Sequence, residues 1–507
     1  MVDRKKNGRH VDFYEPEPLV QENAFLQAKP DRSFPKNFHE SQELLPEPFW
    51  QGHEGAIDCY WRTWDLAFRN LKQVSYGNGF VAPYIDTAFN DCIFMWDSAF
   101  ILMFARYGRR AFDFQRTLDN FYARQHPDGF ICREIQEWDG RDRFHAHDPV
   151  STGPNVLPWC EWEYYLNFGD AERLSRVFAP LLAYYRWTRK YRSWPDGSYW
   201  STGFGCGMDN QPRVAAPYGR EVDHGHMAWI DATAQAAFAA KVLIRMAEKL
   251  GRGADAADLH GEVERLTQYV NQRMWDEDAG FYFDRLRDER LSRVKTVGAF
   301  WTLLAGIVPG ERLTAFVSHL DDEKTFKRPH RVPSLSADDA DYDGNGGYWR
   351  GSVWPPTNYM VLRGLTASGF GDLAAEIGRN HHDMVVKVFG KTGTVWENYA
   401  PETADKGNSA RGDFVGWGGV APVAVFLEYV LGLRPDVPAN RLVWDVRLTE
   451  AHGVKRYPFG AKGILDLSVE KRPKPTAEPK INVCSNVPVE LELRWPGGGR
   501  VTQVMRG

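Results

Sequence analysis

The strongest constraint on the fold is a series of helical segments separated by short loops. The clearest segment, residues 225–253, has a broad Ala-rich apolar face followed by basic residues and Gly251, where a helix can end. Residues 254–275 continue directly with apolar side chains at helical spacing. Because short loops join neighbouring helices as antiparallel hairpins, the pattern predicts a fold built from helix pairs.

Further stretches of the same character run through most of the chain. They are expected at 98–107, 111–124, 156–168, 170–190, 297–307, 309–320, 357–367, 371–388 and 418–431. Helical domains of this type can exceed ~400 residues as one unit, so residues 54–435 are predicted to form one mainly α domain.

The two ends of the chain differ from this helical region. Residues 1–53 are rich in Pro, Glu and Asn and lack helical periodicity, which predicts an extended N-terminal arm. After residue 435, segments such as LVWDVRL (442–448) and VELELRW (489–495) alternate apolar and polar residues and are separated by Gly and Pro. Residues 436–507 are therefore predicted to form a small β-rich appendage.

The bulk properties exclude several classes of partner. A formal net charge of −5 provides no basic face for a nucleic acid. No stretch approaches the ~18 consecutive apolar residues of a membrane span, and the charged start MVDRKKNGRH leads into no apolar signal region. Six cysteines scattered without a CxxC pair are typical of reduced thiols. These features together predict a cytoplasmic protein and leave its oligomeric state open.

Two segments of the helical region place an acid beside aromatic residues or glycines. FNDCIFMWDSAF (89–100) carries Trp96 and Asp97 ahead of an apolar helix, where Asp97 could also serve as a first-turn acid. GFGCGMDNQPR (203–213) describes an irregular glycine-rich loop that carries Asp209, which could also form an Asx-turn.

Two later segments have the same character. Residues 338–361 open with Asp339, Asp341 and Asp343 at calcium-loop spacing, but Arg350 occupies the position of the closing Glu, so the match to a calcium loop fails. Whether these aspartates bind a cation stays open from the sequence. TVWENYAPETADKGNSARGDFVGWGG (394–419) sets Glu397 between Trp396 and Asn398, where a structural salt bridge is the plain alternative.

The chemistry that fits this pattern is cleavage of a glycosidic bond. That reaction needs one protonated carboxyl group and one carboxylate, and aromatic faces stack on sugar rings. Aromatic residues make up 14% of the chain. No phosphate-binding loop, dinucleotide fingerprint, GxSxG or HExxH motif occurs, and the histidines at 145–147 and 381–382 lack further ligands. Neither a metal nor a cofactor is therefore expected.

Five motifs in sequence order give the chain a family resemblance. FMWDSAF, GMDNQPR, YWRGSVWPPTNY, WENYAPET and VGWGG resemble glycoside hydrolase family 63, in particular its mannosylglycerate-hydrolase-like branch, and more distantly the trehalases. The resemblance covers roughly residues 55–432. It implies an (α/α)6 barrel and an inverting mechanism on α-linked sugars.

The resemblance also implies roles for individual residues. Asp209 matches the general acid and Glu397 the general base, and an inverting pair stands about 6.5–9.5 Å apart to admit a water molecule. Burial should raise the pKa of Asp209 so that it stays protonated. The residues expected to bind the substrate are Trp96, Asp97, Gln125, Tyr348, Arg350, Trp354, Tyr399 and Trp417.

The expected substrate is a small carbohydrate. Larger family members carry an N-terminal β-sandwich that has no counterpart before residue 55, which favours a disaccharide or a glycosylglycerate over an oligosaccharide. Arg350, Arg213 and Arg220 are candidates for binding a carboxylate or sulfonate on the leaving group, and each could equally pair with a nearby Asp.

Three alternatives remain open from the sequence. A sugar epimerase or isomerase on the same barrel would use histidines such as His224 and His226. A phosphorolytic glycosidase would need a basic pocket where Glu397 lies. A carbohydrate-binding protein without activity would not need both acids.

Overall fold

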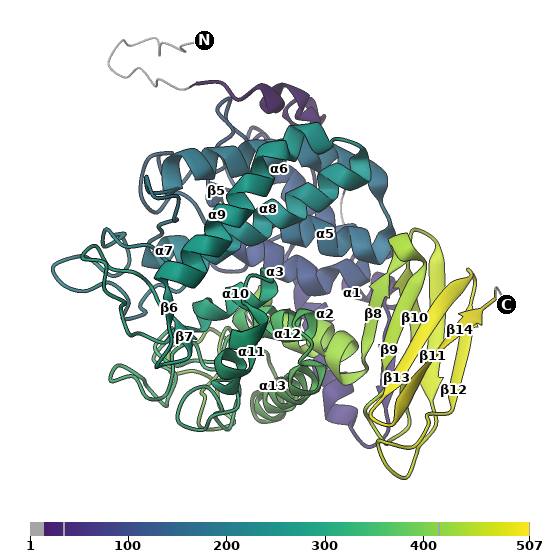
Figure 1. The fold of residues 1–507 in the computed structure, drawn as a ribbon. Helices are drawn as coiled ribbons and strands as arrows, with labels where there is room; N and C mark the ends of the chain where they lie inside the picture. Colours follow the sequence, from purple (N-terminus) through teal and green to yellow (C-terminus); the bar gives the residue numbers. More distant parts are fainter. Residues whose placement is uncertain (1–14, 34–35, 414–415, 506–507) are drawn as a thin grey trace.

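Helices are the main regular elements up to Val430, and two small sheets follow (Figure 1). The computed structural model describes residues 15–33, 36–413 and 416–505. Residues 1–14 and 34–35 of the expected N-terminal arm lie outside this described part. In the remainder of the arm, short turns of 3₁₀-helix at Pro18–Glu22 and Ala24–Gln27 replace a fully extended chain.

The predicted helix pairs are present. They are α5 (Leu157–Phe168) with α6 (Ala171–Arg192), α8 (Ile230–Leu250) with α9 (Ala257–Arg273), and α12 (Pro355–Ala367) with α13 (Gly371–Thr392), and the members of each pair contact one another. Gly169 and Gly251 end α5 and α8 at φ angles of 64° and 68°. A left-handed residue lets the chain reverse there at little steric cost.

Six helices contact one another in a closed series. They are α3 (Met95–Ala105), α5, α8, α10 (Trp301–Leu304), α12 and the π-helix η9 (Val420–Val430). Each contacts the next in this order, and η9 contacts α3. Every residue of α3 and η9 is buried, which explains why both sequences are apolar on all sides.

Three helical segments differ from the expectation. The stretch 111–124 forms a 3₁₀ turn at Phe114–Leu118 and a single helical turn, α4 (Asp119–Tyr122). Within this stretch, Asn120 fixes a neighbouring loop, because its Oδ1 atom accepts hydrogen bonds from the backbone amides of Val81 and Ala82. The stretch 418–431 is largely a π-helix, and α2 (Glu54–Arg69) was not among the predicted segments.

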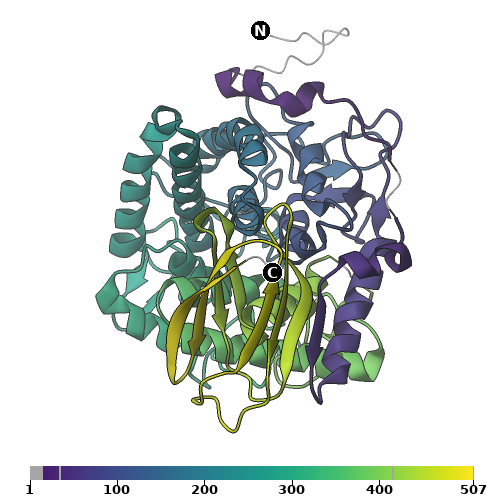
Figure 2. The same cartoon turned by 90° about the vertical axis from the view of Figure 1, so that its right-hand side faces the viewer.

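The C-terminal sheet region predicted from the alternating pattern is confirmed. One four-stranded sheet contains β10 (His452–Phe459), β11 (Gly463–Val469) and β12 (Ile481–Ser485); the other contains β8 (Leu433–Asp436), β9 (Arg441–Asp445), β13 (Val489–Trp495) and β14 (Gly498–Val504). The first sheet also includes β1 (Glu47–Trp50), which pairs antiparallel with β10 (Figure 2). The end of the N-terminal arm thus joins the C-terminal sheet, which the sequence pattern did not predict.

No helix in the part of the chain that the structure describes is long and apolar enough to cross a bilayer. All six cysteines lie in that part and are unpaired, as predicted; five are buried and Cys484 is exposed.

A buried ion pair joins three of the six central helices. Arg106, which follows α3 and is 2% exposed, donates a hydrogen bond to Glu428 of η9 at 2.7 Å and to the hydroxyl of Tyr359 of α12 at 3.1 Å. Glu428 also accepts hydrogen bonds from Tyr107 at 2.9 Å and from Arg363 at 3.2 Å. The Glu428 carboxylate is therefore satisfied by groups from different helices, and the Arg106 charge is paired through its Nη2 atom.

Glu428→Leu is expected to lower the free energy of unfolding by roughly 3–5 kcal/mol, because it removes the carboxylate 2.7 Å from the buried Arg106 guanidinium and leaves this charge to Glu163, 3.8 Å away. The matched control is Glu478→Leu in the exposed Arg500–Glu478 pair, where the loss should stay below about 1 kcal/mol. Denaturant unfolding followed by tryptophan fluorescence measures both. Equal losses in the two variants would contradict a structural role for the buried pair.

Candidate active site

A cavity of about 390 Å³ opens among the loops that precede the central helices. A volume of this size is in the range of small-molecule sites. Its lining residues are Phe89, Asn90, Phe94, Met95, Trp96, Asp97, Arg133, Glu134, Arg143, Phe144, Gly153, Pro154, Phe204, Gly207, Asp209, Tyr348, Trp349, Glu397 and Trp417. The wall therefore combines aromatic rings with four carboxyl groups and two arginines.

A two-stranded ribbon forms one side of the cavity. Strand β4 (Cys92–Phe94) pairs antiparallel with β5 (Glu134–Gln136), and Phe94 lies opposite Glu134. The amide of Met95 donates to the carbonyl of Arg133 at 2.8 Å. This pairing brings the first turn of α3, with Trp96 and Asp97, beside the Arg133 and Glu134 side chains.

The loop that carries Asp209 begins at the single-turn helix α7 (Gly203–Cys206). Thr202 caps α7 by accepting a hydrogen bond from the Gly205 amide at 2.8 Å. A Cβ atom at Gly203 would lie 2.3 Å from the Asp209 carbonyl oxygen, so the loop needs glycine at this position. The loop thus folds back on α7 and presents Asp209 to the cavity.

The residues after Asp209 fix the loop from behind. Asn210 donates to the carbonyl of Gly347 at 3.1 Å and accepts from the amide of Trp349 at 2.8 Å, which joins the loop to the 345–350 segment. Gln211 donates to the carbonyl of Ser334 at 2.7 Å. The polar residues of the GMDNQPR motif therefore position the acid.

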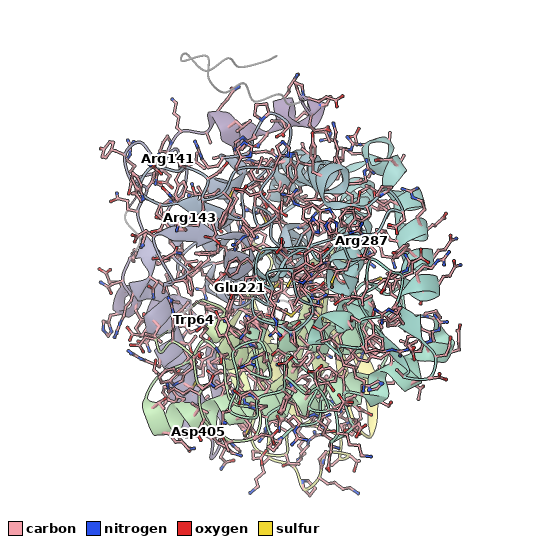
Figure 3. The ribbon with its side chains drawn as sticks, turned by 90° about the vertical axis from the view of Figure 1, so that its left-hand side faces the viewer. Trp64, Arg141, Arg143, Glu221, Arg287 and Asp405 are labelled. Carbon is pink, nitrogen blue, oxygen red and sulfur yellow. The ribbon has the colours of Figure 1, made fainter. Side chains whose placement is uncertain are left out.

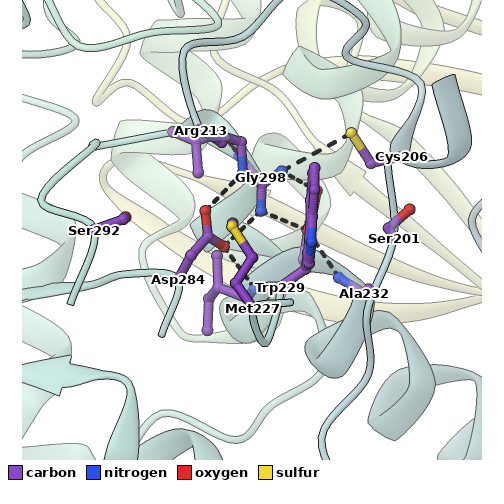
Figure 4. Close-up of polar contacts among 12 residues, drawn as sticks. Ser201, Cys206, Arg213, Met227, Trp229, Ala232, Asp284, Ser292 and Gly298 are labelled. Carbon is purple, nitrogen blue, oxygen red and sulfur yellow. Dashed lines mark hydrogen bonds and ion pairs between the residues drawn. The ribbon is translucent and has the colours of Figure 1, made fainter. Parts of the chain in front are cut away.

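Arg213 ends this motif in a buried ion cluster (Figure 4). Its guanidinium is bidentate to Asp231, at 2.7 and 2.8 Å, and to Asp284, at 2.8 and 2.6 Å. All three side chains are at most 1% exposed. The ring of Trp229 lies 4.3 Å from the Arg213 guanidinium carbon. We call Arg213, Asp231 and Asp284 the Arg213 clamp.

Glu397 faces the cavity from the other acid-bearing segment. One carboxylate oxygen accepts a hydrogen bond from the Tyr348 hydroxyl at 3.2 Å and the other accepts from the Arg411 amide at 3.1 Å. The indole of Trp417 donates to the Glu397 carbonyl at 3.0 Å. Tyr348 adopts a φ angle of 60°, a conformation that costs energy in a bulky residue and is common at functional sites.

The environments of the two acids favour different protonation states. Burial raises the pKa of Asp209 to about 7, the Arg133 charge opposes the rise, and the Glu221 and Glu397 charges add to it. Burial also raises the pKa of Glu397, but the Arg411 amide and the Tyr348 hydroxyl stabilise its ionised form. The pair can therefore hold one proton near neutral pH, on Asp209.

A third acid in the cavity is also driven toward its protonated form. Burial, followed by the charge of Glu134, raises the pKa of Asp97 well above its usual value. A protonated carboxyl group can both donate and accept a hydrogen bond, which suits a sugar hydroxyl.

Six of the ten residues predicted from the sequence line this one cavity. They are Trp96, Asp97, Asp209, Tyr348, Glu397 and Trp417. These residues come from four segments that are far apart in sequence.

The other four predicted residues are not among the lining residues. Gln125 hydrogen-bonds Asn23 at 2.9 Å and the carbonyl oxygens of Gly129 and Pro180, so the structure gives it a packing role instead of the expected contact with substrate. The Arg350 side chain turns toward Asp341, 3.9 Å away. Trp354 stacks on Trp349 with ring centroids 3.8 Å apart, behind the cavity wall.

Tyr399 is the fourth of these residues. It is fully buried, and its hydroxyl accepts a hydrogen bond from the amide of Trp396 at 3.1 Å. It therefore supports the backbone on which Glu397 is mounted.

The arginines predicted to bind a leaving group also lie outside the cavity lining. Arg213 is held entirely by its clamp, and Arg220 lies 4.0 Å from Asp341 outside the lining. The cavity instead contains Arg133 and Arg143, which the sequence analysis did not identify. Arg143 lies on the same loop-rich face as Glu221, away from the C-terminal sheets (Figure 3). Both arginines are brought to the cavity by the β4–β5 ribbon, whose pairing beside Trp96 and Asp97 is a tertiary contact that the sequence alone does not show.

Within the described ranges, no group of three or more His, Cys, Asp or Glu side chains is placed to hold a metal ion. His224 and His226 do not line the cavity, which disfavours an epimerase that uses them as acid and base.

The family model and the sequence relatives agree on one family. The model of the mannosylglycerate hydrolase MGH1-like glycoside hydrolase domain matches residues 92–417, which is more than half of the chain. The mannosylglycerate hydrolase MGH1 of Selaginella moellendorffii is 30% identical over 34% of this chain and 34% of its own length. A probable mannosyl-oligosaccharide glucosidase of Schizosaccharomyces pombe is 27% identical over 52% of this chain and 33% of its own. The matched part thus spans about a third of each of these two relatives.

A solved structure extends the similarity to the fold. The family 63 mannosylglycerate hydrolase of Thermus thermophilus in complex with Tris superposes with a TM-score of 0.57 and 23% identity, and the match covers 73% of this chain and 99% of that one. The chain is therefore a glycoside hydrolase of family 63 and belongs to its mannosylglycerate hydrolase MGH1-like branch.

Proposed function

We propose that the protein is an inverting, exo-acting α-glycosidase that hydrolyses a small α-linked glucoside or mannoside, of the disaccharide or glycosylglycerate type. Asp209 is the general acid and Glu397 the general base. The observation that carries this proposal is the presence of both carboxyl groups on one aromatic-walled cavity, with hydrogen bonds that favour ionisation of Glu397 and a pKa near 7 for Asp209.

The scaffold of this site is, in this proposal, an (α/α)6 barrel formed by residues 54–435. The closed series of contacts among α3, α5, α8, α10, α12 and η9 supports an inner ring. The hairpin partners α6, α9 and α13 support an outer ring.

The mechanism follows from the two protonation states. Asp209 gives its proton to the glycosidic oxygen as the bond to the anomeric carbon breaks. Glu397 takes a proton from a water molecule, whose oxygen attacks the anomeric carbon from the opposite face. Tyr348 orients the Glu397 carboxylate through its hydroxyl. Exchange with solvent then restores the proton to Asp209 and removes it from Glu397.

The sugar is held by the walls near the first turn of α3. The Trp96 and Trp417 rings offer apolar faces for the sugar ring. Asp97, whose burial raises its pKa well above the usual value, exchanges hydrogen bonds with hydroxyl groups of the sugar.

A negatively charged leaving group is favoured by the two arginines of the cavity. The Arg133 side chain is occupied by Glu134, 2.5 Å away, and by the carbonyl of Val150. Arg143 is exposed, and no carboxylate in the described part of the chain forms an ion pair with its side chain. Its guanidinium can accept a carboxylate on the aglycone, as in a glycosylglycerate.

The proposal is tested with a panel of α-linked disaccharides and glycosylglycerates, with the released anomer read by ¹H NMR in the first minutes of reaction. An inverting enzyme releases the β-anomer. Asp209→Asn should lower kcat/KM by roughly 10²–10⁴-fold and lose much less on a dinitrophenyl glycoside, whose leaving group needs no proton. The exposed Asp405→Asn serves as the control (Figure 3). Release of the α-anomer would reject the role of Glu397 as base.

The pH profile of kcat/KM should be bell-shaped. Asp209 acts in its protonated form, so activity is lost as pH rises through its pKa of about 7. Glu397 acts in its ionised form, so activity is lost as pH falls through its raised pKa.

Glu221→Gln removes a negative charge that raises the pKa of Asp209, and the alkaline limb of the profile should move to lower pH. Arg133→Gln removes the opposing positive charge and should move the limb to higher pH. Shifts in the same direction would contradict the assignment.

Arg143→Ala should raise KM for a glycosylglycerate by roughly tenfold or more, the value of one charge-assisted hydrogen bond. It should change KM for a neutral disaccharide much less. Arg141→Ala is the matched control, since Arg141 is exposed near Arg143 and pairs with Asp139 outside the cavity (Figure 3). An equal change of KM for charged and neutral substrates would show that Arg143 does not bind the charged leaving group.

A further inference from the structure

A second cavity lies between the helical part and the C-terminal sheets. Its volume is about 250 Å³, and its lining residues are Arg109, Arg110, Asp113, Phe168, Gly460, Ala461, Lys462 and Gly463. Arg109 and Arg110 follow α3 and the 3₁₀ turn Arg106–Gly108. Residues 460–462 form the turn between β10 and β11, and Gly463 begins β11. The cavity shares no lining residue with the active-site cavity, which contains the opposite end of α3.

The lining of this cavity is predominantly positive. Arg109, Arg110 and Lys462 contribute three positive charges, and Asp113 contributes one negative charge. Arg109 is held in place by Asp170, 3.5 Å away, and by the Phe168 ring, whose centroid is 4.9 Å from the guanidinium carbon. The position of the Arg109 guanidinium beside the cavity is therefore fixed, although Asp170 offsets part of its charge.

Arg110 has no counter-ion in the described part of the chain. Its Nη1 atom is buried, and no hydrogen-bond acceptor among the described residues reaches it. Burial and the nearby charge of Arg456 lower the pKa of Arg110, while Arg456 itself is paired with Glu47 at 2.9 Å. A buried guanidinium nitrogen is normally hydrogen-bonded, so its position here points to an acceptor supplied by a ligand.

Asp113 presents the complementary feature. Its Oδ1 atom is also buried, and among the described residues no donor reaches it. A ligand that satisfies both groups carries an acceptor for Arg110 and a donor for Asp113, and the positive charges of the lining favour a ligand whose acceptor oxygens are negative. Hydrogen phosphate has both, whereas sulfate has no proton to donate near neutral pH.

We propose that this cavity is a binding site for a small oxyanion of the phosphate class, with Arg109, Arg110 and Lys462 donating to the oxygens and Asp113 accepting from the P–OH group. Arginine suits this role because its planar fork matches phosphate oxygens. The turn between β10 and β11 supplies Lys462, so the bound anion bridges the sheet region and the helix that leads to the active site. The site is independent of the proposed glycosidase mechanism.

The test is isothermal titration of the full-length protein with inorganic phosphate, sulfate and glycerol phosphate at pH 7 and constant ionic strength. Inorganic phosphate should bind roughly tenfold more tightly than sulfate, as one added hydrogen bond implies. Arg110→Gln should weaken phosphate binding by roughly tenfold or more, and Lys462→Gln, at an exposed turn, should weaken it without threatening the fold. Arg287→Gln is the control, because Arg287 is exposed and remote from the cavity lining (Figure 3).

Asp113→Asn tests the selectivity separately. It should bring sulfate affinity to within about twofold of phosphate affinity, because the amide can donate to an oxygen that carries no proton. Tighter binding of glycerol phosphate than of inorganic phosphate would assign the site to the phosphate group of a metabolite; the reverse order would assign it to free phosphate. Absence of phosphate binding, equal affinity for phosphate and sulfate in the unmodified protein, or unchanged binding in both cation variants would overturn the proposal.

Discussion

The Arg213 clamp is the interaction on which the acid side of the site depends. Asp209 lies on an irregular loop between helices, and such a loop has few backbone hydrogen bonds to fix it. Arg213, four residues later, binds two carboxylates that belong to α8 and to the segment after β7 (Phe281–Tyr282). A bidentate contact to each aspartate fixes both position and orientation. The loop is thus anchored to the helical core at full burial, and Asp209 projects from an anchored base.

The chemical difference between the two acids comes from their hydrogen bonds and neighbouring charges, because both carboxyl groups are buried. Desolvation raises the pKa of Asp209 and of Glu397, so burial alone cannot assign their roles. The distinction comes from hydrogen bonds to the carboxylate of Glu397, which favour its ionised form. Arg133 limits the rise at Asp209 and keeps it near 7. A group with a pKa near the working pH can both give up and regain a proton readily.

Much of the fold was predictable because the spacing of apolar residues along the sequence determines where the long helices and the C-terminal strands form. The helices α8 and α9 follow directly from apolar spacing and a terminal glycine. The pairing of β1 with β10 was not predictable, since it joins the N-terminal arm to a strand near the other end of the chain and β1 has four residues. The sequence of the π-helix η9 predicts an ordinary apolar helix. Because η9 is buried on all sides, its apolar residues show no periodicity that would distinguish a π-helix from an α-helix.

The site shows the same division between local motif and long-range contact. Trp96, Asp97, Asp209 and Glu397 are recognisable because each lies in a motif with special backbone needs, such as the glycines around Asp209. Arg133 and Arg143 carry no such signature, and they reach the cavity through a ribbon of three-residue strands. The residues proposed to cleave the bond are thus fixed by local sequence, whereas those that face the leaving group are set by tertiary pairing. Arg350 and Gln125 lie outside the cavity lining for this reason: a residue near a motif need not face the cavity that the motif builds.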